Sequence, residues 1–129
     1  MSTVLLIIIA IVVLFIGMQL FMVFKMKLKK GKSAPNLEGK AGRLVNNGDK
    51  VLFYFYSPGC RACIPMTPVI KNLAKKNKSV FPVDVSRDMT TAQKFGVMGT
   101  PSTVVIESGV IKEFLVGFQS EDKVRTLLT

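Results

Sequence analysis

The chain has 129 residues, with 18 Lys or Arg against 8 Asp or Glu, two cysteines and no histidine. This length supports one compact domain rather than several. Half of the net charge of +10 lies in residues 25–49, seven basic against two acidic, and the rest is scattered over residues 50–129, eleven against six. Because no basic stripe alternates with aromatic residues, nucleic acid is excluded as an expected partner.

The N-terminal segment is apolar over the length of a membrane span. Residues 4–24, VLLIIIAIVVLFIGMQLFMVF, are 21 residues without a charge. At about 1.5 Å per residue, a helix of this length crosses the roughly 30 Å of a bilayer's hydrocarbon layer. A cleaved signal peptide is the alternative, but it would begin with basic residues and have a shorter apolar stretch. We therefore predict a single transmembrane helix, with residues 1–30 forming the anchor and its basic end.

A cluster of lysines follows this segment. It comprises five lysines within eight residues: Lys25, Lys27, Lys29, Lys30 and Lys32. Basic residues beside a span tend to remain on the cytoplasmic side, so we expect the soluble domain there, with an extracytoplasmic domain as the alternative. The lysines are also expected to contact anionic headgroups, which makes the lipid bilayer a predicted partner.

Residues 31–49 are rich in Gly, Asn, Lys and Ser. They are predicted to be a linker, with room for one turn of helix around residues 41–45. The folded domain is then expected over residues 50–129. Its first element is the apolar run VLFYFY, residues 51–56, which is typical of a strand buried on both faces.

The middle of the domain predicts a helix, a strand and a second helix. Apolar residues recur at helical spacing over residues 60–76 and predict an amphipathic helix. Residues 80–85, VFPVDV, predict a strand, in which Pro82 should lie near the start or on an unpaired side. A short helix is expected around residues 90–95, with Gly96 ending it.

The C-terminal part predicts a hairpin and a closing helix. Residues 102–107 and 110–117 are expected to be strands joined by a tight turn at Ser108 and Gly109. Ser120 is a suitable N-cap for the last helix. This order of elements predicts an α/β domain with a mixed sheet, parallel in one half and antiparallel in the other, flanked by helices on both faces.

The cysteine pair lies in SPGCRACIPM, residues 57–66, as Cys60 and Cys63. Zinc and iron-sulfur clusters need four ligands, so one chain cannot complete either, although a zinc ion shared by two chains stays open. Covalent haem attachment would need a histidine where Ile64 stands. A copper site would need methionines of the apolar segment, Met18, Met22 and Met26. For these residues, lipid contact or helix packing is the favoured role. Dithiol chemistry needs neither metal nor cofactor.

The predicted position of the pair suits that chemistry. At the start of a helix, free N–H groups and the helix dipole would stabilise a Cys60 thiolate, and the charge of Arg61 would lower its pKa further. Cys63, one turn on, is placed to form a disulfide with Cys60. We therefore predict that Cys60 attacks and Cys63 resolves. A static disulfide is the alternative, but closing so short a loop would stabilise the fold little.

Over residues 50–128, the chain resembles the thioredoxin-like family. The resemblance rests on three features: the aromatic strand leading into CRAC, Pro68 eight residues after Cys60, and FGVMGTPS, residues 95–102, before the hairpin. It implies a thioredoxin-like mixed sheet flanked by helices. It also implies protein disulfides as substrates, and a thiol electron donor or acceptor as partner.

The same resemblance implies a substrate-binding loop. In such proteins the peptide bond before Pro101 is cis and faces the cysteines, and the backbone of Thr100 pairs with an extended substrate segment. Strand addition of this kind is a common way to bind peptides. Gly59 stands where the family has a tryptophan, so the rim of the site should be more open to substrate.

Other positions depart from the family's pattern. Its buried aspartate falls on Tyr54 and the accompanying lysine on Val80, so the usual proton relay for Cys63 is missing. Pro65 removes an N–H and should loosen the first turn of the helix. Two functions follow: a membrane-tethered thiol:disulfide oxidoreductase, and, as the alternative, a non-catalytic docking or redox-sensing subunit of a membrane complex.

Overall fold

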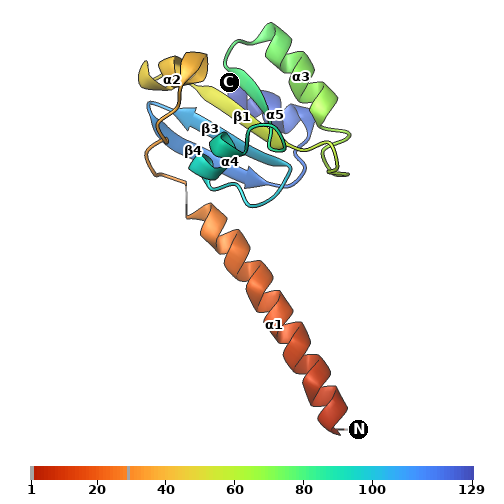
Figure 1. The fold of residues 1–129 in the computed structure, drawn as a ribbon. Coiled ribbons are helices and arrows are strands. Elements are labelled where there is room, and N and C mark those ends of the chain that lie inside the picture. Colours follow the sequence, from red (N-terminus) through yellow and green to blue (C-terminus); the bar gives the residue numbers. More distant parts are fainter. Residues whose placement is uncertain (1, 29) are drawn as a thin grey trace.

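The computed structural model describes residues 2–28 and 30–129 and has a long N-terminal helix attached to a domain with one sheet (Figure 1). Helix α1 (Ser2–Lys27) extends away from the domain. Within Ser2–Lys25, an 18-residue window has a mean hydropathy of 3.1, and none of that window is buried inside the protein. By length and composition, α1 qualifies as a membrane span or as a signal sequence.

The sheet has the strand order β2-β1-β3-β4. Strand β1 (Val51–Tyr56) pairs in parallel with β2 (Val80–Asp84) and antiparallel with β3 (Ser102–Glu107), which forms a hairpin with β4 (Val110–Val116). The predicted mixed sheet is therefore confirmed. Since β2 is an edge strand, Pro82 lies in a strand with one unpaired side, where its missing N–H is tolerated.

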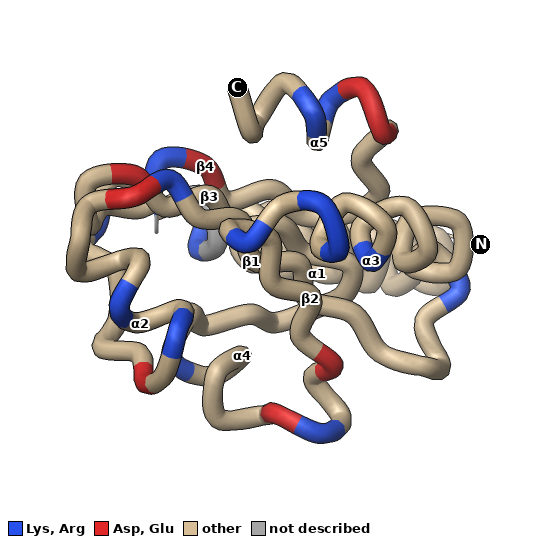
Figure 2. Tube along the Cα trace, turned by 90° about the horizontal axis from the view of Figure 1, so that it is seen from above, with Lys and Arg blue, Asp and Glu red and all other residues tan. Residues whose placement is uncertain are grey.

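Helices cover both faces of the sheet, as predicted. Helices α2 (Gly39–Asn46) and α4 (Met89–Phe95) pack on one face, and α3 (Thr67–Lys76) and α5 (Glu121–Leu128) pack on the other. Because side chains alternate along a strand, successive residues of β1 enter two different cores. The basic residues of the domain are spread over α2, α3 and α5 rather than gathered on one element (Figure 2).

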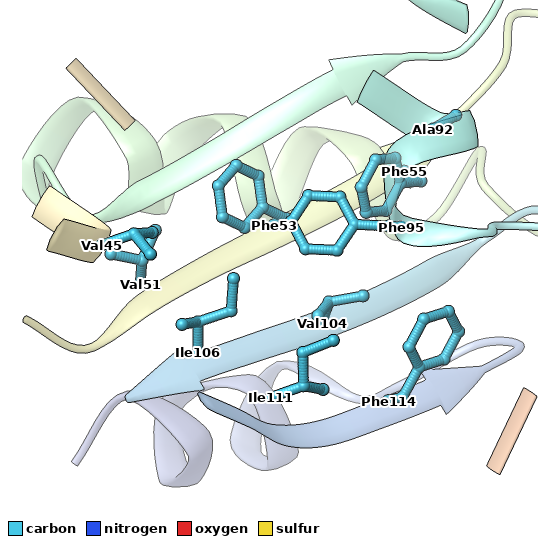
Figure 3. Close-up of a cluster of buried hydrophobic side chains, with 10 residues drawn as sticks. All are labelled: Val45, Val51, Phe53, Phe55, Ala92, Phe95, Val104, Ile106, Ile111 and Phe114. Carbon is cyan, nitrogen blue, oxygen red and sulfur yellow. The ribbon is translucent and has the colours of Figure 1, made fainter. Parts of the chain in front are cut away.

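The first core, drawn in Figure 3, consists of aliphatic and aromatic side chains. Its centre is aromatic: the ring of Phe95 lies 4.9 Å from that of Phe53 and 5.4 Å from that of Phe55, between centroids. Its buried members are Val45, Val51, Phe53, Phe55, Ala92, Phe95, Val104, Ile106, Ile111 and Phe114. The second core, beneath α3 and α5, has as its buried members Leu52, Tyr54, Met66, Ile70, Leu73, Val80, Val105 and Val124.

The segment predicted to be a linker packs partly with the domain. Helix α2 lies within it, over the residues where one turn of helix is predicted, and contributes Val45, which is 6% exposed, to the first core. A Cβ at Gly42 would collide with the carbonyl group of Leu37, so this close approach needs glycine. The composition of residues 31–49 resembles a flexible linker, but burial of an apolar side chain holds this short helix in place.

The start of the same segment pairs with the edge of the sheet. The N–H of Gly31 donates to the carbonyl of Ile111 at 2.7 Å, and the N–H of Ile111 donates to the carbonyl of Lys32 at 2.9 Å. The N–H of Ala34 donates to the carbonyl of Gly109 at 2.8 Å. These bonds cover part of the free edge of β4. The start of the segment predicted to be a linker is therefore attached to the sheet.

Local signals at turns and caps are confirmed. Gly96 ends α4 in the left-handed conformation, with φ of 67°. The hairpin turn has positive φ at both Ser108 and Gly109, 55° and 74°. The hydroxyl of Ser120 accepts a hydrogen bond from the N–H of Lys123 at 3.2 Å, which caps α5.

Candidate active site

The two cysteines lie in the loop between β1 and α3 and form a disulfide, with Cα atoms 5.3 Å apart. Cys63 is buried, at 2% exposure, whereas Cys60 is half-buried. The N–H of Cys63 donates to Sγ of Cys60 at 3.2 Å. A donor at this distance favours a thiolate on Cys60 once the disulfide is reduced. Of the two, Cys60 is thus the more accessible cysteine and the one with an N–H aimed at its sulfur.

The predicted helix over residues 60–76 begins later than expected. Helix α3 starts at Thr67, and the residues before it form turns, in which the N–H of Ile64 donates to the carbonyl of Arg61 at 3.2 Å. Pro65 has no N–H, so it cannot make the bond to Arg61 that an α-helix requires. The prediction that Cys60 lies in the first helical turn is therefore wrong. The dipole of α3 acts within its own first turn, beyond Cys60.

A pair of hydroxyl groups lies next to the cysteine loop. The hydroxyl of Tyr54 is 2.8 Å from Oγ1 of Thr67, and it donates to the carbonyl of Cys63 at 3.5 Å. Burial raises the pKa of Tyr54 more than the bond to Thr67 lowers it, and Tyr56 adds to the increase. The site therefore holds a neutral phenol where the resemblance expects a carboxylate. Sequence reasoning missed Thr67, because its partner Tyr54 lies 13 residues away on a strand and no local signal joins the two.

A groove of about 470 Å³ extends from the disulfide along the start of α3 to the end of β2. It is lined by Tyr56, Ser57, Pro58, Cys60, Cys63, Ile64, Thr67, Pro68, Lys71, Asp84 and Arg87. The Ser86 hydroxyl donates to Asp84 at 2.6 Å and lowers the pKa of that carboxyl group, with smaller contributions from Arg87 and Lys71. The groove therefore carries an ionised carboxylate among cations.

Sequence reasoning also missed Asp84 as a residue of this groove. The signal was its place at the end of β2: parallel strands have their carboxyl ends at the same edge of the sheet, so Asp84 lies near the end of β1 and the loop that follows.

The Thr100–Pro101 peptide bond is cis, as the resemblance implied. Ser102, the first residue of β3, pairs with Phe55. Pro101, one residue earlier, therefore lies beside Tyr56 at the end of β1. The cysteine loop begins at the same place, and the two loops therefore emerge from one end of the sheet. Pro101 is buried and Thr100 is half-buried.

Gly59 and Arg61 are exposed on the cysteine loop. A Cβ built on Gly59 would meet no heavy atom within 4 Å, so the loop is open at this position.

The model of the thioredoxin family matches residues 38–129. The chain belongs to the thioredoxin family. It is 31% identical over 81 residues to thioredoxin of Bacillus subtilis, a match that covers 60% of this chain and 78% of that one. It is 34% identical over 88 residues to thioredoxin H3 of Arabidopsis thaliana, covering 66% and 75% of the two chains. The solved structure of a mutant thioredoxin from Halobacterium salinarum is 30% identical and superposes with a TM-score of 0.59, over 76% of this chain and 93% of that one.

The thioredoxin fold and the Cys60–Cys63 disulfide together make this chain a thiol:disulfide oxidoreductase. Thioredoxins act on protein disulfides, which are the class of substrate for this site. The family match begins just before α2, so it includes this helix and leaves α1 outside the shared domain.

Proposed function

We propose that this protein is a membrane-anchored thioredoxin that reduces disulfides of proteins at the cytoplasmic face of a membrane. The observation that carries the redox role is a disulfide with one half-exposed and one buried cysteine in a thioredoxin domain. The apolar length of α1 supports the anchor, and the lysines that follow it favour the cytoplasmic side. In that compartment thiols are kept reduced, which favours reduction as the direction.

In the proposed reaction, the Cys60 thiolate attacks one sulfur of the substrate disulfide. A bond forms between Cys60 and that sulfur, the substrate disulfide breaks, and the other substrate sulfur leaves as a thiolate that takes a proton. The Cys63 thiol then loses its proton and attacks Sγ of Cys60, which releases the second substrate thiol and forms the Cys60–Cys63 disulfide. Two electrons pass to the substrate, and an external dithiol restores the pair.

The other predicted site residues have supporting roles in this proposal. Thr100 and Pro101 offer the backbone edge against which an extended substrate segment is held. Gly59 leaves room for that segment beside Cys60, and the positive charge of Arg61 favours the thiolate.

Trapping the intermediate tests the order of attack. With the full chain in detergent micelles, Cys63→Ser should accumulate a mixed disulfide with a disulfide-containing peptide substrate, because Cys60 still attacks and nothing resolves. Cys60→Ser should form no adduct and should lose insulin reduction, with an unchanged circular dichroism spectrum. An adduct that forms on Cys63 instead would reverse the assigned roles.

The reduction potential of the Cys60–Cys63 pair tests the direction of electron flow. A potential of about −270 mV would fit a reductant, and a potential of about −120 mV would fit an oxidant.

A membrane-impermeant maleimide tests the proposed side. The only two cysteines of the chain are those of the site, so labelling of the reduced protein reports where the domain lies. In intact cells the protein should stay unlabelled, and lysis should expose it. Labelling of intact cells would place the domain outside and make oxidation of exported proteins the better function. A mature mass lacking the N-terminal segment would identify α1 as a cleaved signal sequence.

A further inference from the structure

The chain leaves α1 and enters the domain almost without slack. Helix α1 ends at Lys27, and Gly31 is already hydrogen-bonded to β4 through Ile111. Three residues lie between them, so their Cα atoms are at most about 14 Å apart even when the chain is fully extended. Nζ of Lys30 also lies 3.4 Å from a carboxylate oxygen of Glu113 on β4. The domain therefore lies close to the end of α1.

The end of α1 lies against one particular part of the domain. Lys25 of α1 lines a cavity of about 270 Å³ together with Gln93, Gly96, Val97 and Met98, where α4 passes into the loop that leads to Thr100 and Pro101. Helix α1 also contacts β4. In Figure 1 the loop between α4 and β3 lies on the side of the domain from which α1 extends. The proposed substrate-binding loop is therefore on the anchor side of the domain.

Three large apolar side chains are exposed around this loop: Met98, Val116 and Phe118 are 52%, 45% and 54% exposed. Met98 lies in the loop, two residues before Thr100, and Gly117, between the other two, donates its N–H to the carbonyl of Pro101 at 2.8 Å. We call these three residues the apolar rim. Exposed apolar side chains beside a binding loop are typical of a surface that contacts a protein or a membrane.

We propose that the apolar rim rests in the headgroup region of the bilayer, so that the active site acts on disulfides in segments of membrane proteins close to the membrane surface. This inference rests on the proposed membrane anchor. Exposed lysines where α1 meets the domain, Lys25, Lys30 and Lys32, supply the charge that anionic headgroups attract. Apolar side chains flanked by lysines are the arrangement by which proteins lie on a bilayer surface.

The chain contains no tryptophan, so a single introduced tryptophan reports its own surroundings. We would place Met98→Trp and Phe118→Trp, separately, in the full chain reconstituted into vesicles of phosphatidylcholine and phosphatidylglycerol, with and without brominated acyl chains. Bromine quenches only tryptophans that contact lipid. Both variants should lose at least half of their fluorescence in brominated vesicles.

Two controls make the result decisive. Lys78→Trp lies in the connection between α3 and β2, at the end of the sheet away from Pro101 and on the far side of the domain from α1 (Figure 1), and should not be quenched. Phe15→Trp, in the middle of α1, should be quenched strongly if α1 spans the bilayer. Circular dichroism checks that each variant is folded.

The outcomes separate the two proposals. Strong quenching of Phe15→Trp, with Met98→Trp and Phe118→Trp no more quenched than Lys78→Trp, would overturn the contact of the rim with lipid and leave the anchor standing. A blue-shifted but unquenched Phe118→Trp would point to a protein surface as the cover and would overturn the inference as well. Absence of quenching at Phe15→Trp would remove the anchor and this inference together.

Discussion

The core between the sheet and helices α2 and α4 is built from aliphatic and aromatic side chains, whereas the core beneath α3 and α5 also contains hydroxyl groups, among them those of Tyr54, Thr67 and Thr103. Phe53 and Tyr54 are neighbours on β1 and are almost equally buried, at 2% and 0% exposure. Phe53 contacts other rings, while Tyr54 hydrogen-bonds next to Cys63. One strand thus supplies packing on one face and polar contacts to the active site on the other.

This comparison predicts that the largest loss of stability comes from the aromatic face. Phe53→Ala removes a buried ring that packs on Phe81 and Phe95, and it should lower the free energy of unfolding by about 3–5 kcal/mol. Chemical denaturation of the full chain in detergent, followed by tyrosine fluorescence, measures the change. Phe118→Ala removes the same side chain from an exposed position and should cost about 0.5 kcal/mol or less. Equal losses at the two positions would contradict the assignment of the core.

On the other face, Tyr54→Phe keeps the ring and removes the hydroxyl. At pH 7 it should lower the free energy of unfolding by about 1–2 kcal/mol, because Thr67 and the carbonyl of Cys63 lose a partner. The raised pKa of Tyr54 means that the wild-type protein loses stability as pH rises above about 10, where the unfolded tyrosine ionises first. The difference between variant and wild type should therefore shrink in that range.

Tyr56→Phe is the matched control for Tyr54→Phe. Tyr56 is half-buried and packs on Tyr54, with ring centroids 5.5 Å apart, so its substitution also keeps an aromatic ring in place. It should leave the alkaline stability loss of the wild-type protein largely unchanged. If both variants respond equally to pH, the hydroxyl of Tyr54 has no special role.

Substitution of Thr103 should change the free energy of unfolding by a smaller amount and in the opposite direction. Oγ1 of Thr103 is buried and has no hydrogen-bond partner among the residues that the structure describes. Thr103→Val replaces the hydroxyl by a methyl group of similar size and should raise the free energy of unfolding by up to about 1 kcal/mol. Thr67→Val makes the same chemical change where a bond to Tyr54 exists, and it should lower stability instead. The same sign for both variants would disprove this distinction between the hydroxyl groups.

Asp84, in the groove beside the disulfide, should have the smallest effect on stability. Its lowered pKa, due first to the Ser86 hydroxyl, stabilises the folded protein above the ordinary pKa of aspartate, near 4, and this contribution is lost as pH falls through the lowered value. Asp84→Asn should shift the urea midpoint slightly at pH 7 and leave it unchanged near pH 2. A Ser86→Ala variant should reproduce part of the shift, and a shift that persists at pH 2 would contradict a role for the ionised carboxylate.

Much of the fold follows from signals that lie close together in the sequence. The run at residues 51–56 predicts a strand buried on both faces, Gly96 and Ser120 predict helix ends, and Ser108 with Gly109 predicts the hairpin turn, all of which the structure contains. Each of these signals is a conformational preference or a side-chain period that acts over a few residues. The spacing of the two cysteines belongs to the same group, and it identified the redox pair.

Other features depend on contacts between distant residues. Residues 31–34 pair with residues 109–111, and Val45 enters the aromatic core, although the composition of residues 31–49 predicts a linker. The bond from Tyr54 to Thr67 joins a strand to a helix across the cysteine loop.

The sequence by itself therefore determined the elements, the apolar N-terminal helix and the chemistry of Cys60 and Cys63, because each is encoded by neighbouring residues. Only the tertiary structure decided two other features: the neutral hydroxyl pair beside the disulfide, and the attachment of the chain after α1 to the edge of β4. Hydrogen bonds and burial between distant segments overcame the local preferences there. The free energy of such contacts exists only once the sheet has brought those segments together.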